Sequence, residues 1–403
     1  MSARCFFAAL ALIAAAGTAA AAEPFHRAEL IFPLERWHNH ASSLVELPNG
    51  DIFAVWYHGS GERRADDVVI QAALLPAGTT RWTPRYTIAD VKRFPDCNPI
   101  VFLDRDQRLW LVWPTILANL WETALLNLRI TSDIDHLYRR PRWDVSENLL
   151  FHLPGFEKRV REAVEPELKR VAPGSRAEQY LKAVLKHAGD KYFRRLGWMP
   201  RAHPVQLPSG RILLPLYSDG FSFSLVAITD DGGRSWFTSE PIIGWGAIQP
   251  TIARTRDGTL VAYMRDNGPP PKRMHISKST DDGLTWSPAV DSDLPNPGSG
   301  AEVINLEDGS WLMIYNDTER GRHSLAVSIS EDEGRTWRWT RHLELDTRAE
   351  KAGAFHYPSI IQAGDGTLHA TYSYFLNHLP GGTVKSIKHA HFNVEWVKQG
   401  DPK

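Results

Sequence analysis

The feature that most constrains the fold of this chain is a unit of two short strands joined by a polar turn, which occurs six times. The copies are "SSLVELPNGDIFAVWY", "PIVFLDRDQRLWLVW", "HPVQLPSGRILLPLY", "PTIARTRDGTLVAYM", "EVINLEDGSWLMIY" and "PSIIQAGDGTLHATY". Their turn positions are Gly50, Gln107, Gly210, Gly258, Gly309 and Gly366, at intervals of 57, 103, 48, 51 and 57 residues. The long interval holds an extra stretch of about 45 residues, so the underlying period is near 50. Four strands per unit of this length predict an all-β chain folded as a six-bladed β-propeller.

A tryptophan closes each copy of the unit. Three closures are plain, "ITDDGGRSW", "STDDGLTW" and "SISEDEGRTW", and three degenerate ones end at Trp82, Trp143 and Trp396. Asp accepts backbone N–H bonds, Gly adopts positive φ and Trp packs into the blade, so we interpret the closures as tight turns rather than calcium loops. A strand at Ala28–Phe32 is expected to close the last blade onto the first.

The segment 150–197 departs from the repeat because its apolar residues keep helical spacing. These residues are Val160, Val164, Leu168 and Val171, then Tyr180, Ala183, Val184 and His187. We expect a helical insertion within the second blade of a propeller that covers residues 23–403. Its two helices would pack on the propeller either as a cap or lid or as a decoration without a functional role.

Residues 1–22 have the layout of a signal peptide, with one positive charge, an apolar run over residues 6–16 and small residues at the end. The run is too short to span a bilayer, and no second long apolar run follows. Cleavage near Ala22 would remove Cys5 and leave only Cys97, so no internal disulfide is expected. The protein is therefore predicted to be exported, to the periplasm or the medium, without a membrane span.

The charge balance and the motifs exclude several classes of function. A formal net charge of −1 does not suit a nucleic-acid surface. The sequence has no HExxH, no CxxC and no metal-ligand spacing, so we expect no metal and no cofactor. The oligomeric state is not indicated by the sequence.

In a propeller the innermost strand of each blade lines the central channel, and sites form where these strands begin. Aligning the six copies on their turns puts a polar set at that entrance: His40, Asn98, Arg201, Gln249, Glu302 and Tyr357. A purely structural hub would be small and apolar, so this set predicts a polar ligand.

The ends of the second strands and the loops after them add further polar residues: Arg63, Arg64, Asp66, Asp67, Tyr217, Arg265 and Asp266. Arginines, acids and tyrosines converging on one pocket suit an anionic or polyhydroxylated substrate, because Arg grips carboxylates through paired hydrogen bonds. Sugar rings would gain stacking surface from Trp56, Trp113 and Trp245. The predicted partner is therefore a glycan.

On these repeats and motifs the chain resembles the sialidase (neuraminidase) superfamily with BNR/Asp-box repeats, and most of all its bacterial group of predicted neuraminidases. The resemblance covers residues 24–400 apart from the insertion. It implies that Tyr357 in "FHYPSI" is a nucleophile activated by Glu302 in "GAEVINLEDG". It also implies that Asp67, or Asp66, is the acid/base, and that Arg63 or Arg64 lies near it.

The chain departs from this family in the arginines that grip the substrate carboxylate. His40 stands where the first arginine is expected, and the second position falls near Asn316. Arg201 and Arg265 come from other blades and are candidates for a substitute grip. The resemblance therefore implies the fold and the catalytic positions but not a specificity for sialic acid.

Three functions follow from these residues. The first is an exo-acting glycoside hydrolase that releases a terminal acidic sugar. The second is a polysaccharide lyase, in which His40 or His203 would abstract the proton beside a uronate carboxylate with help from Tyr357. The third is a carbohydrate-binding propeller without catalysis.

Overall fold

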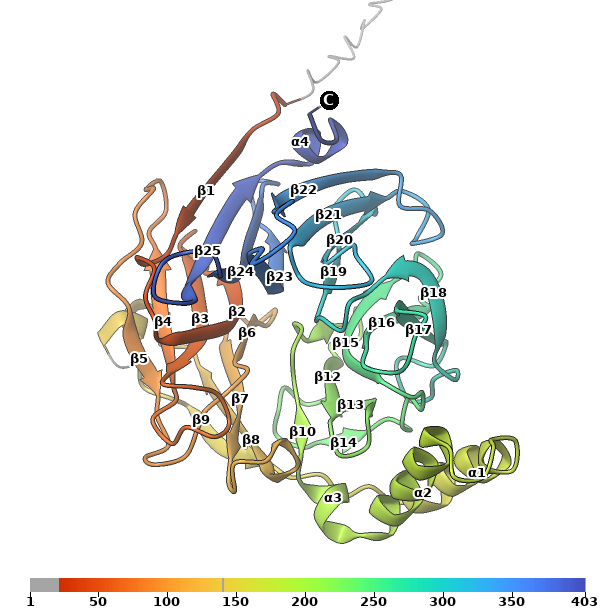
Figure 1. Cartoon of the computed structure of the whole chain (residues 1–403). Helices are drawn as coiled ribbons and strands as arrows, with labels where there is room; N and C mark the ends of the chain where they lie inside the picture. Colours follow the sequence, from red (N-terminus) through yellow and green to blue (C-terminus); the bar gives the residue numbers. More distant parts are fainter. Residues whose placement is uncertain (1–21, 140, 403) are drawn as a thin grey trace, which may run out of the picture.

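The computed structural model describes residues 22–139 and 141–402, which form a ring of six antiparallel sheets around a common axis (Figure 1). The expected six-bladed propeller is confirmed. Each blade begins with its innermost strand at the centre of the ring and proceeds outward through antiparallel neighbours.

The first three blades are built from residues 38–238. The first is β2 (His38–Glu46), β3 (Ile52–Gly59), β4 (Val69–Leu75) and β5 (Tyr86–Ala89); the second is β6 (Ile100–Leu103), β7 (Leu109–Ile116), β8 (Ala124–Thr131) and β9 (Val145–Leu149). The third is β10 (Trp198–Met199), β11 (Val205–Gln206), β12 (Ile212–Ser218), β13 (Phe223–Thr229) and β14 (Phe237–Thr238). Short helical turns η1 (Trp121–Thr123) and η2 (Ile134–Arg139) flank β8.

The other three blades complete the ring. The fourth is β15 (Ala247–Arg254), β16 (Leu260–Asp266), β17 (Arg273–Ser279) and β18 (Val290–Pro295); the fifth is β19 (Glu302–Asn305), β20 (Trp311–Tyr315), β21 (Ser324–Ser330) and β22 (Trp339–Leu345). The sixth is β23 (Ala354–Gln362), β24 (Leu368–Leu376), β25 (Val384–Phe392) and β1 (His26–Leu30), followed by helix α4 (Val394–Lys398). Trp396 therefore lies in a helical turn and not in the hairpin expected from the sequence.

The two ends of the described chain meet in the sixth blade. Strand β1 pairs with β25 in antiparallel register from His26–Phe392 to Leu30–Lys388. Glu29 accepts hydrogen bonds from His389 Nδ1 at 2.7 Å and from Trp82 Nε1 of the first blade at 3.2 Å. The predicted closing strand is thus confirmed, shifted two residues toward the N-terminus.

The tryptophan turns have the geometry expected of tight hairpins. In the third blade, Asp231 accepts from the backbone N–H of Ser235 at 2.9 Å, and Trp236 Nε1 donates to the Gly233 carbonyl at 3.2 Å. Gly233 has a φ of +92°, and a Cβ there would lie 2.6 Å from the Trp110 ring. The glycine is therefore required both by the turn and by the close approach of the neighbouring blade.

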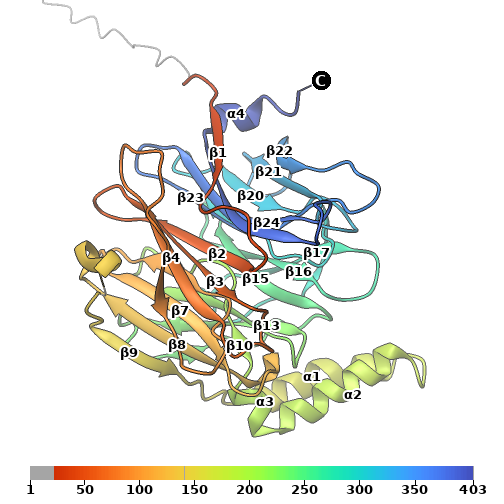
Figure 2. The same cartoon turned by 60° about the vertical axis from the view of Figure 1, so that its left-hand side comes forward.

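The predicted helical insertion contains α1 (Phe156–Leu168), α2 (Arg176–Gly189) and α3 (Lys191–Arg195). It follows β9, the last strand of the second blade, and leads into the third. Figures 1 and 2 show the helices at the outside of the ring, beside the third blade and away from its centre. Their apolar face, which includes Val160, Val164 and Val184, packs into the same core as Trp198 and Phe221. The insertion is therefore docked on the propeller but does not cover the central channel.

The predicted signal peptide lies outside the described residues, except for Ala22. None of the helices in residues 22–139 and 141–402 has both the length and the apolar sequence that a bilayer-spanning segment needs.

Candidate active site

A polar cavity of about 280 Å³ opens at the centre of the propeller. It is lined by His40, Tyr57, Glu62, Asn98, Trp121, Tyr217, Asp219, Gln249, Arg265, Asn267, Arg322 and Tyr357. Each of these residues lies either at the start of an innermost strand or at the end of a second strand and in the loop after it. The cavity thus lies where the sequence led us to expect a site, and its lining includes residues that the sequence did not single out. Of the side chains in residues 22–139 and 141–402, no group of three or more His, Cys, Asp or Glu is arranged to hold a metal ion.

Local irregularities at the starts of the innermost strands help to shape the pocket. Ala41, Asn98, Gln249 and Tyr357 occupy equivalent places in four blades, and their φ values are +53°, +40°, +55° and +53°. The ladder register shifts at this point in β2, β15 and β23, which marks a bulge. Bulges re-aim side chains next to active sites, and a bulky residue such as Tyr357 adopts positive φ only when its surroundings impose it.

Tyr357 lies half-buried at the pocket wall, and its hydroxyl oxygen is held by two donors. Arg265 Nη1 donates to it at 2.7 Å and Gln249 Nε2 at 3.0 Å. The phenol ring stacks on the ring of His40, with centroids 4.3 Å apart, and the Arg322 guanidinium lies 5.5 Å from its centroid. Positive charge and N–H donors therefore converge on this one oxygen.

Two guanidinium groups, those of Arg265 and Arg322, line the pocket. Arg322 also donates to the Gly298 carbonyl at 2.7 Å, which fixes one end of its planar head. Sequence reasoning missed Arg322, which lies in "TERGRHS" after β20. Arg322 lies in the loop between β20 and β21, just before β21 begins, so reading the whole of each loop after a second strand would have included it.

Arg201, predicted to bind substrate, is buried with 3% of its surface exposed and does not line the pocket. Its Nη2 donates to the Pro358 carbonyl at 2.8 Å and its Nη1 reaches the Ser42 carbonyl at 3.4 Å. Its guanidinium carbon lies 5.0 Å from the Tyr357 ring centroid. Arg201 therefore supports the pocket from behind and ties the third blade to the first and the sixth.

Two carboxylates line the pocket, and their environments differ. Burial raises the pKa of Asp219 to about 6, against the opposing effect of Arg265. Burial also acts to raise the pKa of Glu62, but hydrogen bonding to His38 and Tyr57 outweighs it, and the pKa is lowered. The Glu62 carboxylate lies 3.1 Å from His38 Nε2 and accepts from the Tyr57 hydroxyl at 3.0 Å. A pair of carboxyl groups with pKa values displaced in opposite directions is suited to acid and base roles.

The predicted acid/base, Asp67, lies outside the pocket. It is exposed and accepts from the backbone N–H and the hydroxyl of Ser60 at 3.1 and 2.9 Å. Its alternative, Asp66, is also exposed and accepts from Asn119 at 2.9 Å. Glu62 of the same loop takes the pocket position instead, because the loop turns back on itself through the Ser60–Asp67 contact.

Glu302, predicted to activate Tyr357, is occupied by other partners. One carboxylate oxygen accepts from the backbone N–H and from Nδ1 of His203, at 2.8 and 2.7 Å, and the other accepts from the Ile360 N–H at 2.8 Å. The predicted contact with the Tyr357 hydroxyl is not among the hydrogen bonds of the described residues. Burial acts against both charges, but their mutual attraction lowers the pKa of Glu302 and raises the pKa of His203.

The second nitrogen of His203, Nε2, donates to the Leu44 carbonyl at 2.8 Å. Since both ring nitrogens face acceptors, His203 is an imidazolium paired with Glu302. A doubly protonated ring has no lone pair for proton abstraction, so His203 is not suited to act as a base.

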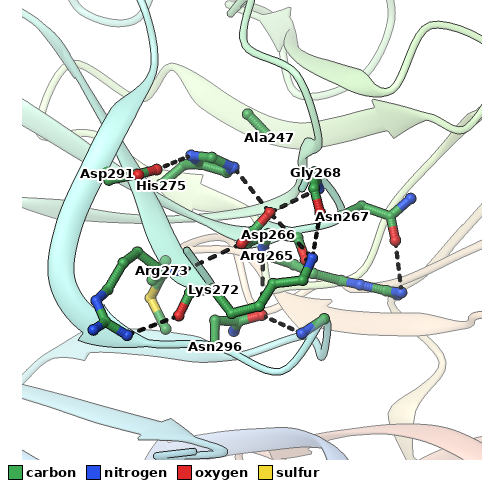
Figure 3. Close-up of polar contacts among 12 residues, drawn as sticks. Ala247, Arg265, Asp266, Asn267, Gly268, Lys272, Arg273, His275, Asp291 and Asn296 are labelled. Atoms are coloured by element: carbon green, nitrogen blue, oxygen red, sulfur yellow. Dashed lines mark hydrogen bonds and ion pairs between the residues drawn. The ribbon is translucent and has the colours of Figure 1, made fainter. Parts of the chain in front are cut away.

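Asp266, predicted to bind substrate, is buried and shapes the loop after β16 (Figure 3). Its carboxylate accepts from the N–H groups of Gly268 at 2.7 Å and Arg273 at 3.2 Å. Arg265, near the end of β16, donates to Asn267, in this loop, through a hydrogen bond of 3.2 Å. Asp266 therefore positions two pocket residues without reaching the pocket itself.

The remaining predicted residues lie at the rim or away from it. Arg63 stacks on the Trp121 ring at 5.2 Å, and Arg64 is exposed. The three tryptophans proposed as stacking surfaces do not line the pocket: Trp56 and Trp113 are buried inside their blades, and Trp245 stacks on Tyr180. Trp121, which sequence reasoning did not single out, is the tryptophan at this pocket.

Sequence comparisons point to one group of proteins. A family model described as a BNR repeat-like domain matches residues 195–370. An exo-alpha-sialidase of Aspergillus fumigatus is 26% identical over 205 residues, 49% of this chain and 48% of that protein. A sialidase of Bacteroides fragilis is 28% identical over 130 residues, 30% of this chain and 23% of that protein. The matched regions thus span about half and about a quarter of the two curated relatives.

Solved structures agree over most of the fold. The NanB sialidase of Streptococcus pneumoniae has a TM-score of 0.66 at 11% identity, covering 92% of this chain and 71% of that one. The intramolecular trans-sialidase of Ruminococcus gnavus, solved with oseltamivir carboxylate, has a TM-score of 0.66 at 14% identity, covering 91% and 96%. At such identities the likeness concerns the fold. The chain therefore has the six-bladed β-propeller fold of these sialidases, and its residues 195–370 match the BNR repeat-like domain.

Proposed function

We propose that the protein is an exo-acting glycoside hydrolase that releases a terminal sugar bearing a carboxylate. The observation that carries this proposal is the combination, in one pocket, of Tyr357, two arginines and two carboxyl groups with oppositely displaced pKa values. A volume of about 280 Å³ lies at the small end of ligand sites and suits one sugar ring rather than a chain.

Arg265 and Arg322 would bind the substrate carboxylate, because guanidinium groups pair with carboxylates through two parallel hydrogen bonds. Both lie against Tyr357, so a bound carboxylate would sit beside the phenol. A carboxylate nucleophile would be repelled at that place, whereas a neutral phenol would not. This supports Tyr357 as the group that attacks the anomeric carbon.

In the first step the phenol oxygen would form a bond to the anomeric carbon while the bond to the leaving oxygen breaks. Asp219, protonated in part near neutral pH, would donate its proton to that oxygen, and Glu62, which is ionised, would take up the proton lost by Tyr357. The donors Arg265 and Gln249 would stabilise negative charge on the phenol oxygen as it forms. In the second step Asp219 would take a proton from the water that attacks the anomeric carbon, the bond between that carbon and the Tyr357 oxygen would break, and Glu62 would return its proton to the phenol oxygen.

The test is a screen of glycosides with acidic and neutral sugars, with products identified by mass and with Tyr357→Phe beside the wild type. We expect hydrolysis of an acidic glycoside by the wild type and its loss in Tyr357→Phe, with an unchanged melting temperature. Full activity of Tyr357→Phe would refute the nucleophile, and glycan binding without turnover by the wild type would identify a non-catalytic binding propeller.

A lyase is the second candidate, and His40 is the observation that favours it. Burial, followed by the neighbouring imidazoles and arginines, lowers the pKa of His40 well below its ordinary value, so the ring is neutral and one of its two nitrogens carries no proton. It lines the pocket and stacks on Tyr357. A uronate polymer would then yield a product with a new carbon–carbon double bond, seen as ultraviolet absorbance, whereas hydrolysis gives none.

Export is also a proposal, which rests on the signal-like pattern of residues 1–22. Sequencing the N-terminus of the protein from a fractionated cell tests it. A mature chain that begins near Glu23 outside the cytoplasm is expected, and a full-length cytoplasmic chain would refute it.

A further inference from the structure

The helical insertion touches the pocket through one loop, residues 219–222 between β12 and β13. This loop carries Asp219 and continues with Gly220 and Phe221. Asp219 lines the pocket, whereas the next two residues face the insertion. The loop therefore has the pocket on one side and α2 on the other.

Two side chains of α2 hold consecutive backbone carbonyls of this loop. His187 Nδ1 donates to the Gly220 carbonyl at 2.8 Å, and the Tyr180 hydroxyl donates to the Phe221 carbonyl at 3.1 Å. The two residues are seven apart, which places them two turns apart on one face of the helix. Because a carbonyl only accepts, the proton of His187 is fixed on Nδ1 by this contact.

Aromatic packing clamps the same loop. The Phe193 ring stacks on His187 at a centroid distance of 3.6 Å and covers Gly220, where a Cβ would lie 2.9 Å from Phe193 Cδ1. Phe221 is fully buried, with Phe156 of α1 at 5.1 Å. The loop thus has little freedom to move as long as the insertion stays docked.

Tyr180 also reaches a second pocket loop. Its ring stacks on Trp245 at 4.9 Å with an angle of 9° between the planes. The residue after Trp245, Gly246, accepts from the N–H of Asn267, which lines the pocket. One face of α2 therefore contacts two segments of the propeller, each next to residues that line the pocket. A helical decoration elsewhere on the ring would make no such contacts.

We propose that the insertion is a positioning element for the acid of the reaction, and that Tyr180 and His187 act through the loop to hold Asp219 toward the leaving group. This proposal rests on the proposed hydrolase function. It assigns the insertion a role in proton delivery and not in covering the pocket.

The experiment uses the full-length protein with Tyr180→Phe, His187→Leu and both together. Tyr180→Phe removes one hydroxyl and keeps the ring on Trp245. Tyr192→Phe is the matched control, because Tyr192 belongs to the same insertion, is exposed and has no hydrogen bond from its hydroxyl among the described residues. His187→Asn keeps an N–H donor near the Nδ1 position and should restore part of the loss.

Rates are compared on two glycosides of the same sugar, one with an alkyl alcohol and one with an acidic phenol as leaving group. In the first step, a displaced acid slows cleavage of the alkyl glycoside but not of the aryl glycoside, since a phenolate leaves without a proton. The comparison uses kcat/KM, which reports the first step alone, because Asp219 also acts as the base of the second step and that step is common to both substrates. The double variant is expected to lose roughly tenfold to hundredfold in kcat/KM on the alkyl glycoside and less than about threefold on the aryl glycoside. Equal losses on both substrates would overturn the positioning role.

The pH profile gives a second readout. Asp219 faces Arg265, Glu122 and Arg63, and its burial sets the pH above which it stops donating. A loosened loop admits water to Asp219, so the upper limb of the kcat profile should move to lower pH in the double variant and not in Tyr192→Phe. An unmoved limb would contradict the proposal.

Amide hydrogen exchange of residues 218–223 keeps this inference separate from the hydrolase proposal, because it needs no substrate. We expect the amides of this loop to exchange faster in Tyr180→Phe and in His187→Leu than in the control Tyr192→Phe. If the wild type hydrolyses no glycoside, the proposed function fails. Unchanged exchange in the variants refutes the positioning role whether or not the wild type is active.

Discussion

Tyr357 occupies a conformation that a bulky residue adopts at a cost of order 1–3 kcal/mol, since its φ is +53°. Ala41, Asn98 and Gln249 share this conformation in other blades, so the bulge belongs to the repeat. In the sixth blade it turns a phenol toward Arg265 and Gln249. A general feature of the scaffold therefore serves here to aim the phenol that we propose as the nucleophile.

Asp219→Asn tests the acid. An amide cannot donate the proton that the leaving oxygen needs, so kcat on an alkyl glycoside should fall roughly 10²- to 10⁴-fold. In the wild type the acid acts while protonated, so activity should fall as the pH rises through about 6, where Asp219 ionises. Steady-state rates from pH 4 to 9 check both points, and an unchanged profile in Asp219→Asn would exclude this role.

Arg322→Gln tests the recognition of the carboxylate. The variant loses a charge-assisted pair with the substrate, so KM for an acidic glycoside should rise roughly 10- to 100-fold. The matched glycoside in which the carboxylate is replaced by an alcohol should be hardly affected. Equal effects on both glycosides would mean that Arg322 does not read the carboxylate.

At the scale of elements, the centre of the ring is held by contacts that cross it. His203, in the third blade, donates to Glu302 in β19 and to the Leu44 carbonyl in β2. Glu302 also accepts from Ile360 in β23, three residues beyond Tyr357. A buried ion pair thus connects four blades beneath the pocket and fixes the strand that carries the phenol.

Glu302→Gln should destabilise the fold, because it leaves the buried imidazolium of His203 without its counter-charge. The expected loss is about 3 kcal/mol or more in the free energy of unfolding. Because the pKa of His203 is raised in the folded state, its contribution to the free energy of unfolding is complete below about pH 6.5. That contribution is lost as the pH rises through the pKa of His203 in the folded protein. The lowered pKa of Glu302 makes its contribution complete above about pH 4.3 and lost at lower pH.

Urea unfolding at pH 5.5 and pH 9 checks this prediction. The wild type should lose more stability than Glu302→Gln between these two values. A variant as stable as the wild type at pH 5.5 would show that the pair contributes nothing to folding.

The strands and turns could be predicted from the sequence wherever they belong to the repeat. The turns at Gly50 and Gly366, the closing strand and the insertion all follow from periodicity and turn chemistry. The side-chain partners did not follow, because alignment gives a residue's place in a strand but not its direction. Glu302 begins an innermost strand as expected, yet its carboxylate points to His203 and Ile360.

The paths of the loops were the other reason why the sequence did not predict all of the pocket residues. In "GERRADD" the sequence offers three acids, and only the path of the loop decides which one reaches the pocket. The hydrogen bonds between Ser60 and Asp67 close that loop and leave Glu62 facing the cavity. Arg322 and Asp219 were missed because their loops carry no motif of their own.

At the scale of the whole molecule, the ring is closed by β1, which pairs with β25. Three imidazoles lie along this closure. His369 Nδ1 and His389 Nε2 are 2.9 Å apart, His389 Nδ1 donates to Glu29 at 2.7 Å, and the His391 ring stacks on His369 at 4.0 Å. The seam that joins the two ends of the propeller therefore contains buried groups that titrate.

The closure should be sensitive to acid. Burial lowers the pKa of His369 to about 2 and the pKa of His391 to about 4, so the unfolded chain binds protons at these residues below about pH 6.5 while the folded chain does not. Stability should therefore fall as the pH drops from about 6.5 toward 4. Thermal unfolding across this range should show a weaker pH dependence in His369→Gln than in the wild type, and an identical dependence would contradict this account.

The most direct test of the central claim is to trap the covalent sugar on the enzyme. An acidic glycosyl fluoride with a second fluorine beside the anomeric carbon slows hydrolysis of the intermediate more than its formation. Peptide mass spectrometry should then find the sugar on Tyr357, and Tyr357→Phe should carry none. Two results would contradict the claim that Tyr357 is the nucleophile of a hydrolase. One is turnover with the sugar attached to Asp219 or Glu62, and the other is an unsaturated product with no sugar attached to the enzyme.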